Sequence, residues 1–182
     1  MAEDAAQYLQ RIELICSDLQ IPRNYSVLRG LRLFPEATKL VTVDESDPTK
    51  RLTPGAAERW LELKRAAVGD GIKFILISGF RSLERQRELI ENKLKRGDQL
   101  AEVLKVLAAP GYSQHHTGLA LDIGAATGFD LTEAFEQTEA FKWLVAHAKE
   151  FGFMMPYPRG NRFGFIYEPW HWVLETIEDL RV

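Results

Sequence analysis

The chain has 182 residues, of which 46% are hydrophobic and 27% are charged. We expect a single domain over residues 1–182 with a sizeable core, because this length fits one ordinary domain and the composition excludes a disordered chain. The 26 Asp and Glu residues outnumber the 23 Lys and Arg residues. The resulting net charge of −3 argues against a nucleic-acid partner, since phosphate binding needs clustered positive charge.

The N-terminus begins with acidic residues and contains no unbroken apolar run. We therefore expect neither a signal peptide nor a membrane span, and a cytoplasmic protein as the sequence is written. If a leader has been removed, the expected location is the periplasm or the cell wall. Cys16 is the only cysteine, so an internal disulfide or a thiolate cluster is excluded, and any metal must be held by His and carboxylate groups.

The first part of the chain, residues 1–70, is expected to be mainly helical. Apolar side chains at helical spacing predict an amphipathic helix over residues 4–19. A second helix is predicted over residues 53–68, where a Thr that can cap the helix is followed by a Pro that suits its first turn. Between them, the short apolar run at residues 40–43 is long enough only for a strand.

The rest of the chain alternates helices with short strands. The apolar run KFILI predicts a buried strand at residues 73–77, which Ser78 and Gly79 end. Further helices are expected at residues 83–95, 99–107 and 138–150, and further strands at 119–123, 163–167 and 170–173. Helices concentrated early and strands late favour an α+β fold, with helices packed on a small, mainly antiparallel sheet.

The segment PGYSQHHTGLALDIG contains two candidate metal ligands, His115 and Asp122. They are seven residues apart, so in one regular strand their side chains would point to opposite faces. They can converge only if the chain bends between them, and Thr117-Gly118 is where a residue without a side chain permits a bend. The glycine is therefore consistent with a metal site.

The segment YEPWHW places a carboxylate, Glu168, three residues before His171. The proline between them prevents a regular interior strand. On an extended stretch after it, Trp170 and Trp172 would face one way and His171 the other, so the tryptophans could line the wall of the site while His171 reaches a metal.

Two His and one Asp make three protein ligands, the number typical of a catalytic zinc site that keeps its fourth position for water. Glu168 is then free to act as a base. Arg81 precedes the helix expected to begin near Leu83, so its guanidinium and the helix N-terminus together favour a carboxylate. The same arginine could instead stabilise an oxyanion.

These segments resemble the motifs of the VanY-type D-alanyl-D-alanine carboxypeptidases. The family motif S-x-H-x-x-G-x-A-x-D is matched by Ser113, His115, Gly118, Ala120 and Asp122. EPWHW matches the second family motif, and the stretch SGFRS around Arg81 resembles the family's S-G-(Y/F)-R-S turn. With average residue usage, the first motif alone would occur by chance in such a chain about once in ten thousand. The resemblance covers residues 74–172.

The resemblance implies the fold of the hedgehog and D-Ala-D-Ala peptidase group and a role for each matched residue. It implies Zn²⁺ bound by His115, Asp122 and His171. It implies Glu168 as the general acid/base and Arg81 as a catalytic residue that faces the substrate. Ser113 and Gln86 would help to hold the end of the peptide.

The function implied is removal of a terminal D-Ala, through a D,D- or an L,D-bond, from a peptidoglycan stem peptide or muropeptide by a monomeric enzyme. One alternative is an endopeptidase that uses the same zinc site, and a second is a non-catalytic zinc-binding domain. The presence of Glu168 disfavours the second alternative. Arg81 favours the carboxypeptidase over the endopeptidase, because it can pair with a terminal carboxylate.

Several other residues are interpreted without a function. His116 stands where relatives often have Gln. It could orient the substrate or point to solvent, and we expect the second. His147 and Trp143 lie in an expected helix and are interpreted as structural, and residues 93–96 as a solvated helix end. After Trp172 the sequence VLETIE departs from the family pattern, which leaves the substrate preference open.

Overall fold

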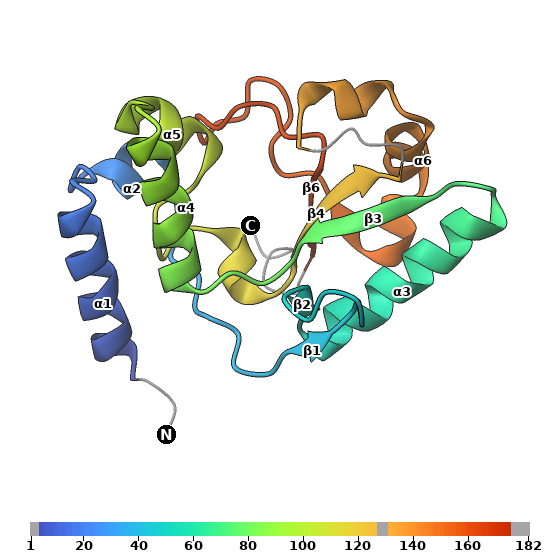
Figure 1. Cartoon of the computed structure of the whole chain (residues 1–182), viewed down its shortest axis with the longest axis horizontal. Helices are drawn as coiled ribbons and strands as arrows, with labels where there is room; N and C mark the ends of the chain where they lie inside the picture. Colours follow the sequence, from blue (N-terminus) through green and yellow to red (C-terminus); the bar gives the residue numbers. More distant parts are fainter. Residues whose placement is uncertain (1–3, 127–130, 176–182) are drawn as a thin grey trace.

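The computed structural model describes residues 4–126 and 131–175 (Figure 1). Its α-helices are α1 (Ala5–Asp18), α2 (Tyr25–Arg29), α3 (Pro54–Gly69), α4 (Leu83–Lys95), α5 (Leu100–Val106) and α6 (Glu139–His147). Its 3-10 helices are η1 (Gln114–Thr117), η2 (Glu133–Gln137) and η3 (Ala148–Phe151). Its strands are β1 (Val41–Thr42), β2 (Arg51–Leu52), β3 (Phe74–Ser78), β4 (Ala120–Ala125), β5 (Phe153–Met154) and β6 (His171–Leu174).

The central sheet has four strands in the order β3-β4-β6-β5, and every neighbouring pair is antiparallel. Strands β1 and β2 form a separate two-stranded ribbon. Figure 1 shows α3 and α6 on one side of the molecule with the sheet, and α1, α2, α4 and α5 grouped on the other side. The expected α+β fold, with helices packed on a small antiparallel sheet, is confirmed.

Two clusters of buried side chains hold these groups together. The larger cluster joins the sheet to α3 and α6 and includes Trp60, Leu121 and Trp143. The smaller cluster joins α1, α2, α4 and α5, and Ile12 and Ile90 belong to it. The turn after β3 and the segment around η1 connect the two groups, so side chains from both can meet along the boundary.

The helices expected at residues 4–19, 53–68, 83–95 and 99–107 are confirmed as α1, α3, α4 and α5. These helices have local sequence signals, because side-chain caps satisfy backbone N–H groups at three of their N-termini. Asp4 and Gln7 form a capping box on α1, Thr53 caps α3, and Ser82 caps α4. The helix expected at residues 138–150 is α6 followed by the 3-10 turn η3.

The strand expected at residues 163–167 is wrong, because that segment is an irregular loop. The Asn161 side chain accepts hydrogen bonds from the backbone N–H groups of Phe163 and Phe165, and Gly164 between them has a φ of +69°. These interactions replace the pairing of a strand ladder. The edge of the sheet is supplied instead by β5, which pairs with β6 and was not predicted.

No helix among residues 4–126 and 131–175 is long and apolar enough to cross a membrane.

Candidate active site

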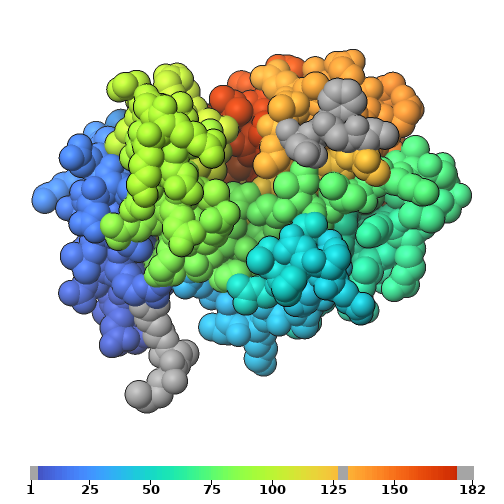
Figure 2. Space-filling model, viewed as in Figure 1, coloured from blue at the N-terminus to red at the C-terminus, as the bar shows by residue number. Residues whose placement is uncertain are grey.

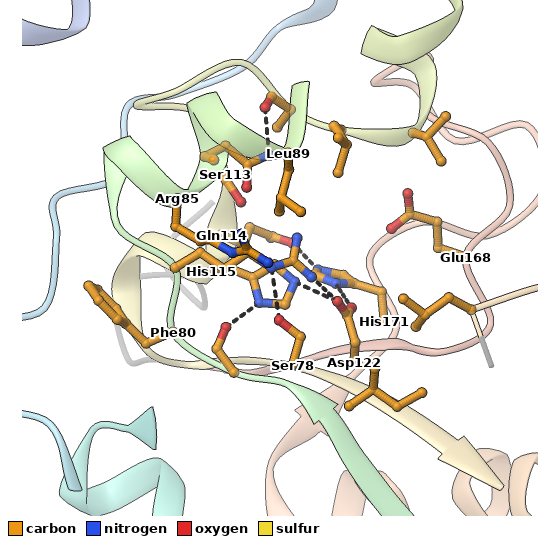
Figure 3. Close-up of a pocket in the computed structure, with 18 of the residues that line it drawn as sticks. Ser78, Phe80, Arg85, Leu89, Ser113, Gln114, His115, Asp122, Glu168 and His171 are labelled. Carbon is orange, nitrogen blue, oxygen red and sulfur yellow. Dashed lines mark hydrogen bonds and ion pairs between the residues drawn. The ribbon is translucent and has the colours of Figure 1, made fainter. Parts of the chain in front are cut away.

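A groove of about 930 Å³ lies where the two groups of helices meet. Its lining comes from the β3–α4 turn, α4, η1, β4 and the segment leading into β6. Figure 2 shows the surface hollowed between α4, in yellow-green, and the orange and red segments of the C-terminal half. Figure 3 shows His115, Asp122, His171 and Glu168 projecting into this groove from different elements.

His115, Asp122 and His171 form a compact, buried group in which one ligand atom from each lies within 4.8 Å of the others. The His115 Nε2 atom is 3.3 Å from Asp122 Oδ2, and His171 Nδ1 is 3.0 Å from Asp122 Oδ1. Asp122 and His171 are direct partners across strands β4 and β6. The expected convergence of these three side chains is confirmed.

Gly118 produces the bend that brings His115 to Asp122. It ends η1 with a φ of +65°, a left-handed conformation that L side chains rarely adopt. His115 therefore projects from a 3-10 turn while Asp122 projects from the following strand. The geometric difficulty of a seven-residue spacing is resolved at the predicted glycine.

Hydrogen bonds orient both imidazole rings. His115 Nδ1 is 2.6 Å from the Gly79 carbonyl oxygen, which can only accept, so Nδ1 donates and Nε2 keeps its lone pair for the site. His171 Nε2 is 2.9 Å from Gln114 Oε1. With the amide oxygen assigned in that position, Nε2 donates and the lone pair of Nδ1 faces Asp122. The Tyr157 ring stacks on His171 at 5.0 Å between centroids.

The charges of the group suit a dication. Burial and the nearby Arg81 guanidinium lower the pKa of His115 to about 4, so its ring is neutral at physiological pH. Burial alone would raise the pKa of Asp122, but the positive charge of the adjacent Arg81 opposes burial, and the pKa of Asp122 lies well below its usual range. Two imidazoles and one carboxylate with inward lone pairs fit Zn²⁺.

Arg81 lies beside this group on the turn between β3 and α4. Its Nε donates to Ser78 Oγ at 2.8 Å, and its Nη2 donates to Asp122 Oδ2. Its side chain is only 13% exposed, so its charge is little screened by water. Arg81 therefore occupies a position from which it can contact negative charge in the groove, as expected.

Glu168 is buried in the wall of the groove, where Figure 3 shows it facing the three-residue group. Burial and repulsion from Asp122 raise the pKa of Glu168 to about 9, although Arg81 opposes the shift. A cation bound between the histidines and Asp122 would lower this pKa, because opposite charge favours the carboxylate. The turn through Pro169 sets Glu168 and His171 on the same groove.

Ser113 and Gln86 are buried and also line the groove, as expected. The Gln86 Nε2 group donates to the Ala108 carbonyl at 2.8 Å, while its Oε1 atom has no hydrogen-bond partner in the described part of the chain. The structure thus brings all the predicted site residues to one groove. Their individual roles remain predictions.

Two expectations about neighbouring residues are wrong. Trp170 lines the groove, but Trp172 packs against Phe141 in the larger core cluster and its Nε1 donates to the Pro169 carbonyl. One tryptophan, not two, therefore forms the wall. His116 does not point to solvent, because it is fully buried and hydrogen-bonded on both ring nitrogens.

Sequence reasoning missed Gln114 and Tyr157, which contact His171. Gln114 is adjacent to His115 in the motif, but its partner is 57 residues away. Neither residue type is specific enough to indicate such a contact from spacing. Only the antiparallel pairing of β4 with β6 brings these segments together.

The fold and the set of donor atoms together are typical of a zinc peptidase. The family model for VanY, D-alanyl-D-alanine carboxypeptidase, matches residues 49–175. The chain belongs to this family.

Two curated relatives are similar over much of the chain. The Bacillus subtilis (strain 168) protein YodJ, a carboxypeptidase by name, is 37% identical over 120 residues, which are 64% of this chain and 43% of the relative. The Enterococcus gallinarum protein VanXYC, named as a bifunctional D-Ala-D-Ala dipeptidase and carboxypeptidase, is 33% identical over 78% of this chain and 76% of its own length. The chain thus spans less than half of the first relative.

Solved structures are similar to the fold. The LdcB LD-carboxypeptidase has a TM-score of 0.69 and 30% identity, over 80% of this chain and 72% of its own. VanYB in complex with D-alanine-D-alanine has a TM-score of 0.66 and 29% identity, over 81% and 83%. The D,D-pentapeptidase VanY in complex with Zn(II) has a TM-score of 0.64 and 28% identity, over 85% and 90%.

Proposed function

We propose that the protein is a zinc-dependent carboxypeptidase that releases the terminal D-alanine of peptidoglycan stem peptides or their precursors, through a D,D- or an L,D-bond. The observation that carries the proposal is the meeting of the His115–Asp122–His171 group with Glu168 and Arg81 in one groove. The relatives support it, because they are named as carboxypeptidases and similar structures contain Zn(II) or D-alanine-D-alanine.

The metal would be held by His115 Nε2, the Asp122 carboxylate and His171 Nδ1. A zinc ion bound there supplies a Lewis acid, which polarises an amide carbonyl and makes water a stronger acid. The hydrogen bonds to Gly79 and Gln114 keep the two rings in the required tautomers.

Glu168 is the proposed proton carrier. It faces the same groove but offers no ligand atom to the compact three-residue group. In this role the carboxylate accepts a proton from the attacking water and delivers it to the nitrogen of the leaving D-alanine. Its burial favours the protonated form, whereas a cation beside it would favour the carboxylate that accepts the proton.

Arg81 is the proposed contact for negative charge on the substrate. A guanidinium that is mostly buried can hold a terminal carboxylate by two parallel hydrogen bonds, which would select the end of a peptide chain. In an endopeptidase that uses the same site, Arg81 would instead contact only the oxyanion formed during hydrolysis. The two functions therefore differ in whether a free carboxylate is needed.

A stem pentapeptide ending in D-Ala-D-Ala and the same peptide with a C-terminal amide separate these functions. The wild type should cleave the acid at least tenfold faster, since a buried charged pair contributes about that much. Arg81→Ala should lose most of the preference. Arg85→Ala is the matched control, because Arg85 lines the same groove but pairs with Glu88 on the exposed side of α4. Equal cleavage of acid and amide by the wild type would favour the endopeptidase.

A further inference from the structure

His116 has no part in the proposed chemistry, yet it is the most deeply buried polar side chain at the site, with 0% exposure. A buried imidazole is costly unless both of its nitrogens have partners. His116 Nδ1 is 2.6 Å from the Arg81 carbonyl oxygen, and His116 Nε2 is 3.1 Å from the Gly111 backbone nitrogen. Both nitrogens are therefore satisfied by backbone groups.

These partners determine the tautomer of His116. The Gly111 N–H can only donate, so Nε2 must carry the lone pair. The Arg81 carbonyl can only accept, so Nδ1 must carry the proton. One neutral ring thus connects the loop before η1 to the turn after β3, and no other tautomer makes both bonds.

The peptide groups of Arg81 are held on both sides by consecutive residues of η1. The Arg81 N–H donates to the His115 carbonyl at 3.1 Å, and the Arg81 carbonyl accepts from His116. Residues 79–82 belong to neither a helix nor a strand, so these bonds take the place of a regular ladder. They fix the point from which the guanidinium reaches Ser78 and Asp122.

The loop that carries Gly111, the second partner of His116, is also held in place. Gly111 has a φ of +88°, and a Cβ atom there would lie 2.6 Å from Ile12 Cδ1. The loop that carries Gly111 is therefore packed directly against α1. The Gly111 N–H thus orients the His116 ring, while the bond from Nδ1 holds the Arg81 carbonyl directly.

We propose that His116 is a positioning residue. It fixes the position of the Arg81 backbone and thereby the position of the guanidinium in the groove. The proposal rests on the proposed function only for the kinetic effect that it predicts. A displacement of about 1 Å in a substrate-contacting group can lower the rate by up to a hundredfold. Loss of the His116 hydrogen bond to Arg81 should therefore lower the rate as well as the stability.

Two variants separate positioning from packing. Asn at position 116 offers an amide N–H near the place of Nδ1 but is too short to reach Gly111, whereas Leu offers neither bond. His116→Asn and His116→Leu should both lower the melting temperature, since each leaves the Gly111 N–H unpaired. Only His116→Leu should lower kcat/KM for the acid peptide, by about tenfold. Trp143→Phe is the stability control, because it removes the hydrogen bond that Trp143 Nε1 donates to Asp70 in the larger core cluster, and neither residue lines the groove.

A double-mutant cycle with Arg81→Ala makes the test specific. Once Arg81 is absent, His116→Leu should change kcat/KM less than about twofold. An equal loss in both backgrounds would overturn the proposal, as would a tenfold loss in His116→Asn. If His116→Leu does not fold, His116→Ala takes its place in the same cycle, since alanine also offers neither hydrogen bond.

Crystal structures of the wild type and His116→Leu test the placement independently of activity. The proposal predicts that Arg81 leaves its position between Ser78 and Asp122 in the variant, and an unmoved guanidinium would overturn it. If the wild type cuts no stem peptide, the proposed function fails while this structural comparison still tests His116.

Discussion

Glu168 combines a buried carboxylate with a position at the edge of the three-residue group. The raised pKa comes from burial and from the Asp122 charge, which are features of the local environment and not of the motif itself. A carboxylate that coordinated a metal would lie among the ligand atoms, whereas Glu168 is not part of that compact group. We therefore separate proton transfer from metal binding at this residue.

Glu168→Gln should keep the fold and the bound zinc but lower turnover by about a hundredfold or more, because a positioned acid/base contributes roughly that much. Glutamine preserves the size of the side chain and cannot accept the proton. Elemental analysis after dialysis measures the zinc, and release of D-alanine measures turnover. Loss of zinc would make Glu168 a ligand, and full activity would leave it without a catalytic role.

The candidate ligands could be predicted from the sequence because each lies in a short, specific motif. His116 and Gln114 lie in the same motif, but their functions depend on partners at Arg81, Gly111 and His171 that only the fold brings near. His116 was predicted to point to solvent because a histidine next to a ligand in a turn gives no sign of its burial. Contacts between segments distant in sequence are the information that a single sequence lacks.

The turn from η1 into β4 is the element on which the site depends most. Gly118 has a φ of +65°, and a Cβ atom there would lie 3.1 Å from Leu40 and 3.2 Å from Thr53. The Thr53 N–H also donates to the Gly118 carbonyl at 3.0 Å. The turn is therefore constrained both by its own conformation and by its contact with the start of α3.

Gly118→Ala should destabilise the protein by about 1–3 kcal/mol, the usual cost of a left-handed conformation at a residue with a side chain. It should also weaken zinc binding, because His115 and Asp122 lie on the two sides of the turn. Chemical denaturation and titration with a competing chelator measure the two effects. Gly55→Ala is the control, since a Cβ atom there meets nothing within 4 Å. Equal stability of the two variants would contradict this account of the turn.

The elements that could be predicted are those with local signals. Helices α3 and α4 follow from caps and periodicity, and β3 follows from an apolar run. The loop at residues 163–167 has the composition of a strand, but hydrogen bonds from Asn161 and a left-handed Gly164 give it another conformation. Strand β5 has two residues, too few to produce a pattern.

At the scale of the whole molecule, the groove lies between two separately packed clusters. The three-residue group belongs to the sheet side, while Gln86 projects from α4 on the other side. Figure 2 shows both sides contributing to the walls of the hollow. The relative placement of the two groups therefore sets the width of the site, which explains why buried links such as that of His116 matter.

Buried titrating groups predict how the stability of the chelated protein depends on pH. His115 and His116 have pKa values lowered to about 4, so the stability that they contribute is complete above their ordinary pKa of about 6.5 and is lost as pH falls through 4. The pKa of Glu168 is raised to about 9. Its contribution is therefore complete below about 4.5 and is lost as pH rises through 9.

Thermal melts of the chelated protein between about pH 4 and pH 10 should thus show a loss of stability on both sides of neutrality. Glu168→Gln has no carboxyl to ionise, so its stability should fall less than that of the wild type as pH rises from about 4.5 to about 9, and the two curves should run parallel below about pH 4.5. The difference between the two melting temperatures, followed against pH, measures this effect. Parallel curves above pH 7 would show that Glu168 is not protonated in the metal-free fold.

The most direct test of the proposed function measures whether release of the product depends on zinc. A chelator first removes zinc from the protein, and one equivalent of zinc is then restored. Stem pentapeptide and tetrapeptide are incubated with the stripped protein and, separately, with the zinc-restored protein. We expect release of free D-alanine, identified by mass, only after zinc is restored. The His171→Ala variant lacks one of three ligands, so it should neither retain zinc nor release D-alanine. Release of D-alanine by the stripped protein, or cleavage at an internal bond with no free D-alanine, would contradict the account.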